Sequence, residues 1–235
     1  MKTIGLLGGM SWESSLEYYR IINETAKGLL GELNSAKSLM YTFNFKEIER
    51  LQRQGDWTKL TYMMVDVAKK LEEGGADLIV ICTNTMHKVA DQVQKEITIP
   101  LIHIADSTAE KIIQSNLKKI GLLGTKFTME EAFYRKRLAE KYELEVIIPD
   151  EIDRQIVHDT IYNELVVGKI KESSRQKFIR IIQGLKMKGV EGVILGCTEI
   201  PLLIRDTDVD IPLFDTTLIH AQAAVKYAIE DYEII

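Results

Sequence analysis

Two three-residue segments carry the side chains best suited to chemistry in this 235-residue chain: Thr-Asn-Thr at 83–85 and Cys-Thr-Glu at 197–199. Each follows an apolar run that predicts a buried strand, and each opens a stretch that predicts a helix. The N–H groups at a helix start lack partners and carry partial positive charge, so they suit a carboxylate. The same environment lowers the pKa of a thiol, and we therefore expect a reactive thiolate at Cys197.

Thr83 and Cys197 occupy corresponding positions because the chain contains an internal repeat. Residues 2–8 recur at 118–124, residues 75–84 recur at 189–198, and residues 99–101 recur at 211–213. Three matches in one order indicate two similar halves. If the halves face each other, their equivalent loops present Thr83 and Cys197 to the two sides of one small ligand.

The elements that must position these residues are parallel strands joined by helices. Short apolar runs alternate with longer amphipathic stretches, which predicts an α/β fold of two similar doubly wound parallel-sheet domains, related by a pseudo-twofold internal duplication with the active site between them. We expect ligands beyond the carboxyl ends of the strands. The expected strands are 2–8, 37–43, 77–82, 100–103, 118–123, 144–148, 191–196 and 212–214.

Domain boundaries and helix starts follow from the same patterns. The first domain is expected to span residues 1–103 and to be completed by a C-terminal helix at 216–235, and the second to span 104–215. Asp56 is expected to cap a helix that closes at Gly74 and Gly75. A capping-box pattern that starts at Thr128 predicts a helix running to about Tyr142.

Composition excludes several classes of function. With 30 Lys and Arg among 35 Asp and Glu, and a net charge of −5, the chain shows no basic face for a nucleic-acid backbone. No apolar run approaches the length of a membrane helix, and the apolar start is interpreted as a strand rather than a signal peptide, so we expect a cytoplasmic protein without membrane contacts. The two cysteines are interpreted as reduced thiols.

Three motifs together resemble a known family. Gly-Leu-Leu-Gly-Gly-Met at 5–10, Thr-Asn-Thr-Met-His at 83–87 and Gly-Cys-Thr-Glu at 196–199 resemble the aspartate/glutamate racemases, and the resemblance spans essentially the whole chain. It implies a small-molecule amino-acid substrate, a homodimer, and two facing cysteines that flank the substrate α-carbon. It also implies catalysis without cofactor, neither pyridoxal phosphate nor a metal. The chain has no CxxC or HExxH pattern, and its histidines are scattered at 87, 103, 158 and 220.

The chain departs from the family pattern at the first cysteine. Alignment on Asn84 and the internal repeat both place Thr83 at that position, with Cys82 one residue earlier on the alternate side of the strand. A threonine hydroxyl is too weakly acidic to be a resting base. We therefore expect the Cys197 thiolate to remove the α-proton and Thr83 to return one, directly or through water or Cys82. The resemblance places Cys197 on the L side of the substrate.

A second departure concerns the substrate side chain. Aspartate-specific relatives carry a basic residue after an Ile-Tyr pair, whereas here residues 161–162 are followed by Asn and Glu. They also carry an arginine after the second strand, where this chain offers Arg50, Gln52 and Arg53. A buried carboxylate without a partner is costly, so the substrate is either acidic and bound by one of these three, or neutral. The family resemblance favours the acidic substrate.

Other side chains beside these loops are candidates for substrate binding. Ser11 is expected to cap the helix after the first strand. His87 lies one helical turn beyond Thr83 and is interpreted as a structural residue near that loop. The candidate substrate-binding residues are Met10, Gln52, Asn84, Thr85, Thr125, Thr198 and Glu199.

Two groups of alternatives stay open from the sequence. A decarboxylase, a maleate-type isomerase or a hydantoin racemase would use similar geometry with one or two thiols. A non-catalytic amino-acid binder would use the helix starts without turnover.

Overall fold

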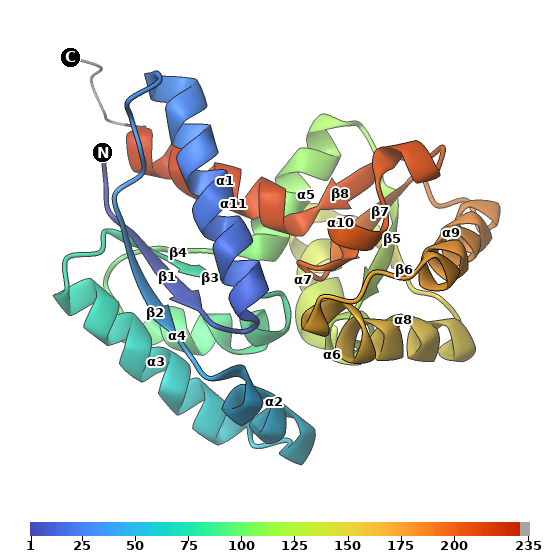
Figure 1. Cartoon of the computed structure of the whole chain (residues 1–235), viewed down its shortest axis with the longest axis horizontal. Coiled ribbons are helices and arrows are strands. Elements are labelled where there is room, and N and C mark those ends of the chain that lie inside the picture. The colour runs from blue at the N-terminus through green and yellow to red at the C-terminus, as the bar shows by residue number, and fades with distance from the viewer. Residues whose placement is uncertain (231–235) are drawn as a thin grey trace. The chain divides into compact units, whose positions relative to one another are not determined.

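The computed structural model describes residues 1–230, and the chain divides into two compact units (Figure 1). Unit 1 is Met1–Ile104 together with the chain from His220 onward, and unit 2 is Ala105–Ile219. The chain therefore leaves unit 1 after Ile104, next to the expected boundary, and returns within the C-terminal helix, α11 (Thr216–Ile229). Of the expected helix at 216–235, residues 231–235 lie outside the described residues.

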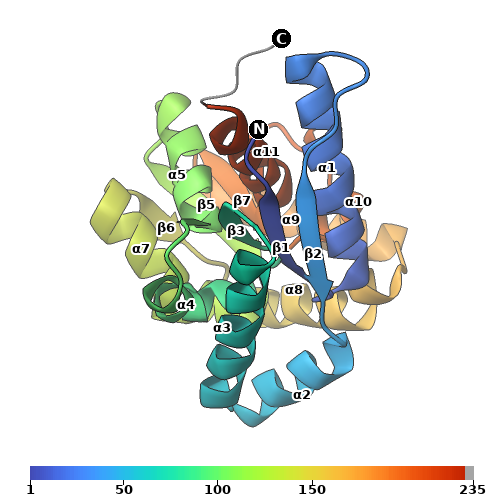
Figure 2. The ribbon, with the colours of Figure 1, turned by 90° about the vertical axis from the view of Figure 1, so that its left-hand side faces the viewer.

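Unit 1 is built on a four-stranded parallel sheet with helices on both faces. Its strands are β1 (Ile4–Gly8), β2 (Ser38–Thr42), β3 (Leu78–Ile81) and β4 (Leu101–Ile102), in the order β2-β1-β3-β4. Helices α1 (Trp12–Leu30) and α11 cover one face. The other face is covered by α2 (Phe45–Gln54), α3 (Trp57–Glu73), the 3₁₀ helix η1 (Thr85–Val89) and α4 (Ala90–Glu96). Strand β2 forms one edge of the sheet beside α1 (Figure 2).

The alternation of side chains along β3 separates the two cores of unit 1. Leu78, Val80 and Cys82 pack with α1 and α11, whereas Ile79 and Ile81 pack with α2, α3 and α4. This is the period-two pattern of a strand buried on both faces. A strand of this kind fixes which face the residues at its end belong to.

Unit 2 repeats the topology of unit 1. Its strands are β5 (Lys119–Gly124), β6 (Glu145–Ile147), β7 (Gly192–Gly196) and β8 (Leu213–Asp215), in the order β6-β5-β7-β8. All eight expected strands are present, and the predicted α/β fold with duplicated parallel sheets is confirmed. The helices of this unit are α5 (Ile104–Gln114), which begins at the boundary, α6 (Lys126–Glu130), α7 (Ala132–Tyr142), α8 (Glu151–Asn163), α9 (Glu172–Met187) and α10 (Ile200–Leu203), with the 3₁₀ helices η2 (Leu165–Val167) and η3 (Asp206–Asp208). Across residues 1–230, no helix combines the length and apolar character of a membrane span.

One expected helix cap is confirmed and another is wrong. The Asp56 side chain accepts the Lys59 N–H at 3.0 Å at the start of α3, which ends at Gly74. The predicted cap at Thr128 fails because Thr125 accepts the Thr128 N–H at 3.3 Å and places Thr128 inside α6. The extended backbone of Glu131 then separates α6 from α7, which ends at Tyr142 as expected.

Two glycines of unit 1 offer a matched test of the turn between β1 and α1. Gly9 has φ +81°, and a Cβ there would collide with the backbone of Phe43, whereas a Cβ at Gly28 of α1 would meet nothing within 4 Å. We expect Gly9→Ala to destabilise the protein by about 2 kcal/mol or more, since it combines backbone strain with a steric clash. Gly28→Ala should stabilise it by about 0.5–1 kcal/mol, because alanine favours the helix.

The measurement is the free energy of unfolding from denaturant titration. An unchanged stability in Gly9→Ala would contradict a tight turn at Gly9 between β1 and α1.

Candidate active site

The loops after β1 and β3 lie side by side because those two strands pair in parallel register. Leu7 of β1 pairs with Ile81 of β3, so the residues that follow each strand reach the same edge of the sheet. Ser11 caps α1, as expected, by accepting the Ser14 N–H at 3.2 Å. The Ser14 hydroxyl in turn donates to the carbonyl of Cys82 at 2.7 Å. The first turn of α1 thus fixes the backbone just before Thr83.

His87 fixes the next carbonyl of the same loop. Its Nδ1 lies 2.8 Å from the carbonyl oxygen of Thr83. Thr83 is partly exposed, whereas Asn84 and Thr85 are buried beside it at the start of η1. The three candidate residues are therefore held together in one short segment of unit 1.

Cys82 belongs to the apolar core of unit 1. Its side chain is fully buried and packs on the α1 and α11 side of the sheet. Burial raises the pKa of its thiol above the ordinary value, because the thiolate would lose its hydration. A core thiol in its neutral form is poorly suited to relay protons.

Unit 2 presents a thiol, a hydroxyl and a carboxylate directly after β7. The Cys197 thiol donates to Glu199 Oε2 at 3.0 Å, and the Thr198 hydroxyl donates to the same oxygen at 2.6 Å. All three side chains are buried. Because the repeat aligns Thr83 with Cys197, it also aligns Thr85 with Glu199. At these aligned positions, unit 2 carries a thiol and its carboxylate acceptor, whereas unit 1 carries two threonine hydroxyls.

The expected low pKa of Cys197 is wrong. Burial and the neighbouring charge of Glu199 raise the pKa of its thiol well above the ordinary value. The helix that follows, α10, has only four residues and supplies little compensating field. The resting form is therefore a thiol hydrogen-bonded to a carboxylate rather than a free thiolate.

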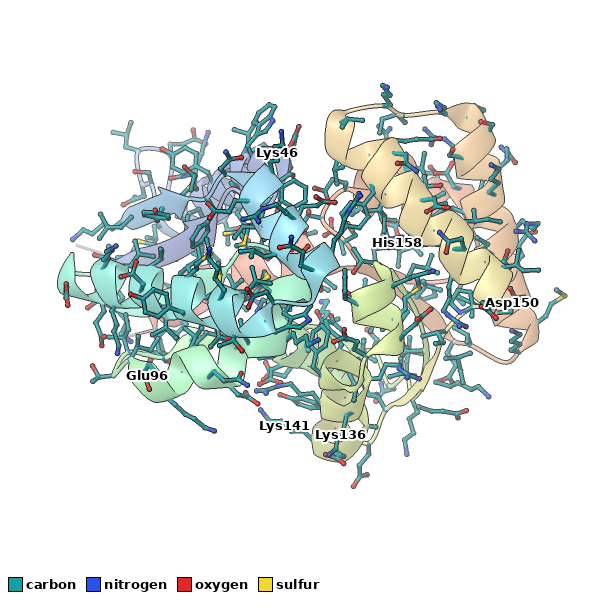
Figure 3. The ribbon with its side chains drawn as sticks, turned by 90° about the horizontal axis from the view of Figure 1, so that it is seen from below. Lys46, Glu96, Lys136, Lys141, Asp150 and His158 are labelled. Atoms are coloured by element: carbon teal, nitrogen blue, oxygen red, sulfur yellow. The ribbon has the colours of Figure 1, made fainter. Side chains whose placement is uncertain are left out.

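Thr125 holds the loop after β5, the counterpart of the β1 loop. Its hydroxyl accepts the Thr128 N–H and lies 3.2 Å from the Thr128 hydroxyl, so it caps α6. His158 of α8, marked in Figure 3, accepts the backbone N–H of Lys126 at 3.2 Å through Nδ1. Thr125 thus has a structural function at this position, whatever it contributes to substrate binding.

Helix α2 carries the three residues expected near a substrate side chain, and they differ in setting. Gln52 is buried, with Nε2 3.3 Å from the sulfur of Met86. Arg53 is exposed and ion-paired with Glu49. Arg50 is also exposed, 3.5 Å from the side-chain oxygen of Gln54.

The side chains at two other candidate positions take part in core packing or in polar contacts within their own unit. Met10 is buried in the core formed by α2, α3 and α4. The carboxylate of Glu164, which follows the Ile-Tyr pair, accepts from Ser174 at 2.6 Å and from Lys171 at 3.0 Å. The Glu164 side chain is thus bound within unit 2.

Glu199→Gln tests the link between the carboxylate and the thiol. We expect the substitution to lower the pKa of Cys197, because it removes the negative charge that opposes the thiolate. The pH profile of alkylation by a small iodoacetyl reagent should then shift to lower pH, with Cys197→Ser identifying the modified thiol. A profile that stays in place would show that Glu199 does not control the thiol, and a shift to higher pH would contradict the expected sign of its effect.

The family of the chain follows from comparison with known proteins. The model of the Asp/Glu/hydantoin racemase family matches residues 7–224. The broad-specificity amino-acid racemase RacX of Bacillus subtilis (strain 168) is 24% identical over 228 residues, which cover 95% of this chain and 96% of RacX.

Solved structures give the same assignment. A Yersinia pestis protein provisionally assigned as an Asp/Glu racemase is 52% identical, with a TM-score of 0.92 over 97% of this chain and 100% of its own. An aspartate racemase homologue from Pyrococcus horikoshii OT3 is 38% identical, with a TM-score of 0.85 over 97% and 99% of the two chains. The chain therefore belongs to the Asp/Glu/hydantoin racemase family and is an isomerase, of the amino-acid racemase type.

Proposed function

We propose that this enzyme inverts the α-carbon of a free amino acid by proton transfer without a cofactor, with Cys197 as the base on one face. The hydrogen bond from the Cys197 thiol to Glu199 is the observation that carries the proposal. It pairs the candidate nucleophile with a group that can take its proton, at the carboxyl end of a buried strand.

The first step moves two protons. The thiol proton of Cys197 passes to the Glu199 carboxylate, and the resulting thiolate takes the α-proton of the substrate. The electron pair of the broken C–H bond stays on the α-carbon as a carbanion, which is delocalised into the substrate carboxylate. The Thr198 hydroxyl, which donates to the same Glu199 oxygen, orients the carboxylate for this exchange.

The second step returns a proton to the opposite face from the Thr83 side. A threonine hydroxyl can donate within a hydrogen-bonded chain, and solvent water restores its proton. Glu199 releases to solvent the proton that it took from Cys197, which returns the thiol and carboxylate to their resting forms. Cys82 is not needed as a relay, since its thiol packs in the apolar core. Because Thr83 is a poor resting base, removal of the proton that faces Cys197 is faster, and early turnover favours L to D. The equilibrium between enantiomers is unaffected, because their free energies are equal.

We propose an acidic substrate, aspartate or glutamate. The aspartate racemase homologue at 38% identity supports this assignment. Arg50 and Gln52 lie on α2 and are the groups proposed to meet the substrate side chain, since Arg53 is paired with Glu49. The second candidate is a wider set of amino acids that includes neutral ones, since the name of RacX records broad specificity.

The test is α-proton exchange in heavy water over a panel of L- and D-amino acids. We expect exchange and inversion of aspartate or glutamate by the wild-type enzyme. Cys197→Ser should lower both by about 10²–10⁴-fold, the range of general acid–base contributions. Thr83→Ala should slow inversion while L-substrate exchange continues, because the thiol can return deuterium to the face from which it took the proton.

The same panel separates the proposal from its alternatives. Rapid exchange of both enantiomers in Thr83→Ala would remove Thr83 from the mechanism. Binding of an amino acid by the wild-type protein and by Cys197→Ser, without exchange in either, would identify a binder rather than a racemase.

We also propose that the enzyme is a homodimer that pairs through α1. Trp12, Leu16 and Tyr19 are 66%, 54% and 52% exposed and form one stripe at i, i+4 and i+7. At roughly 150–250 Å² per large side chain the stripe exposes on the order of 400 Å², about half of one side of a typical interface of about 800 Å² per partner. An uncharged stripe is self-complementary across a twofold axis.

Leu16→Glu should therefore convert a dimer into a monomer, because it places two carboxylates at the centre of the interface. Leu33→Glu, at a fully exposed position outside the stripe, is the matched control and should remain dimeric. Light scattering coupled to size exclusion measures the mass. A monomeric wild-type protein, or a dimeric Leu16→Glu variant, would contradict the proposed interface.

A further inference from the structure

Three of the four histidines lie together inside unit 1. His87, His103 and His220 are all buried, and the ring of His87 lies 4.6 Å from that of His103 and 5.5 Å from that of His220, measured between centroids. Within the described part of the chain, no group of three or more His, Cys, Asp or Glu side chains is arranged to hold a metal ion. The cluster therefore requires another explanation.

Two of these imidazoles hydrogen-bond to backbone groups next to the points where the chain leaves and re-enters unit 1. His87 Nε2 accepts the N–H of Ile104, the last residue before the chain leaves unit 1, at 3.2 Å. His220, the first residue after the chain returns, bonds through Nε2 to the carbonyl of Ile102 at 2.7 Å. His87 and His220 thus both bond to the short segment 102–104.

The partners determine which imidazole nitrogens carry protons. A backbone N–H can only donate, so His87 Nε2 must be the acceptor, and Nδ1–H must be the donor to the Thr83 carbonyl. A carbonyl can only accept, so His220 donates to Ile102 through Nε2–H. In the neutral ring, Nδ1 then accepts the Tyr18 hydroxyl, 2.8 Å away. Both imidazoles are neutral in this arrangement. Burial agrees with this, because it lowers the pKa of His220 to about 4.

We propose that His87 is a positioning residue that sets the orientation of Thr83 relative to the segment 102–104. One rigid ring joins the Thr83 carbonyl to the Ile104 amide, so a change at either contact must move the other. The inference rests on the proposed function, since it assigns His87 to the proton-return step and not to the Cys197 step.

Two substitutions separate the two bonds of the ring. Asparagine places an amide N–H near the position of Nδ1, so His87→Asn can keep the bond to Thr83 and lose the acceptor for Ile104. Glutamine places an amide oxygen near the position of Nε2, so His87→Gln can keep the bond to Ile104 and lose the donor to Thr83. The two variants are matched in chemistry and differ in which contact survives.

The readout is the ratio of α-deuterium exchange to inversion, measured on the L-enantiomer of the substrate in heavy water. We expect His87→Gln to raise this ratio about tenfold or more, because inversion needs the Thr83 side whereas exchange needs Cys197 alone, and His87→Asn to keep a ratio close to wild type. A merely structural role would lower exchange and inversion together in both variants and leave the ratio unchanged.

The outcomes distinguish this inference from the racemase proposal. A wild-type enzyme that exchanges no amino acid contradicts both. Normal racemisation by the wild type with an unchanged ratio in His87→Gln contradicts the positioning role alone.

Imidazole nitrogen NMR of the wild-type protein provides a test that does not depend on whether a variant folds. We expect a neutral His87 with its proton on Nδ1, and a proton on Nε2 instead would overturn the proposal.

Discussion

Parallel pairing of the two central strands is the constraint on which each unit depends. β1 pairs with β3 in unit 1 and β5 pairs with β7 in unit 2, in the same strand order. Adjacent parallel strands have their carboxyl ends at the same edge of a sheet, so strand pairing alone brings the residues that follow them together. Thr83 and Cys197 are the residues that this geometry places at equivalent edges. The repeat in the chain is thus a repeat of fold that also gives these two residues corresponding positions.

The two units differ in the side chains that they carry at corresponding positions. In unit 2 a buried thiol donates to a buried carboxylate, and burial together with the charge of that carboxylate raises the pKa of the thiol and keeps it protonated at rest. In unit 1 the corresponding positions hold the hydroxyls of Thr83 and Thr85. An ionised thiol is a far better base than an alcohol. The unequal pair explains why the proposed mechanism assigns proton removal to one side and proton return to the other.

The support around Thr83 comes from elements that are distant in the sequence. Ser14 of α1 holds the carbonyl of Cys82, and His87 holds that of Thr83 while also binding Ile104. These bonds join the first helix, the β3 loop and the departing chain within unit 1. Buried polar groups of this kind are costly to leave unpaired, so each bond restricts the loop strongly.

The sequence by itself determined the strand pattern, the duplication, the equivalence of Thr83 with Cys197 and the family, because periodicity and motif order are local properties of the chain. Tertiary structure alone decided how these residues behave. The Cys197 thiol has a raised pKa because burial and Glu199 outweigh the effect of a short helix. The ring of His87 reaches Ile104, a residue well beyond its own helix. Burial and long-range contacts depend on how distant segments pack, and no local pattern encodes them.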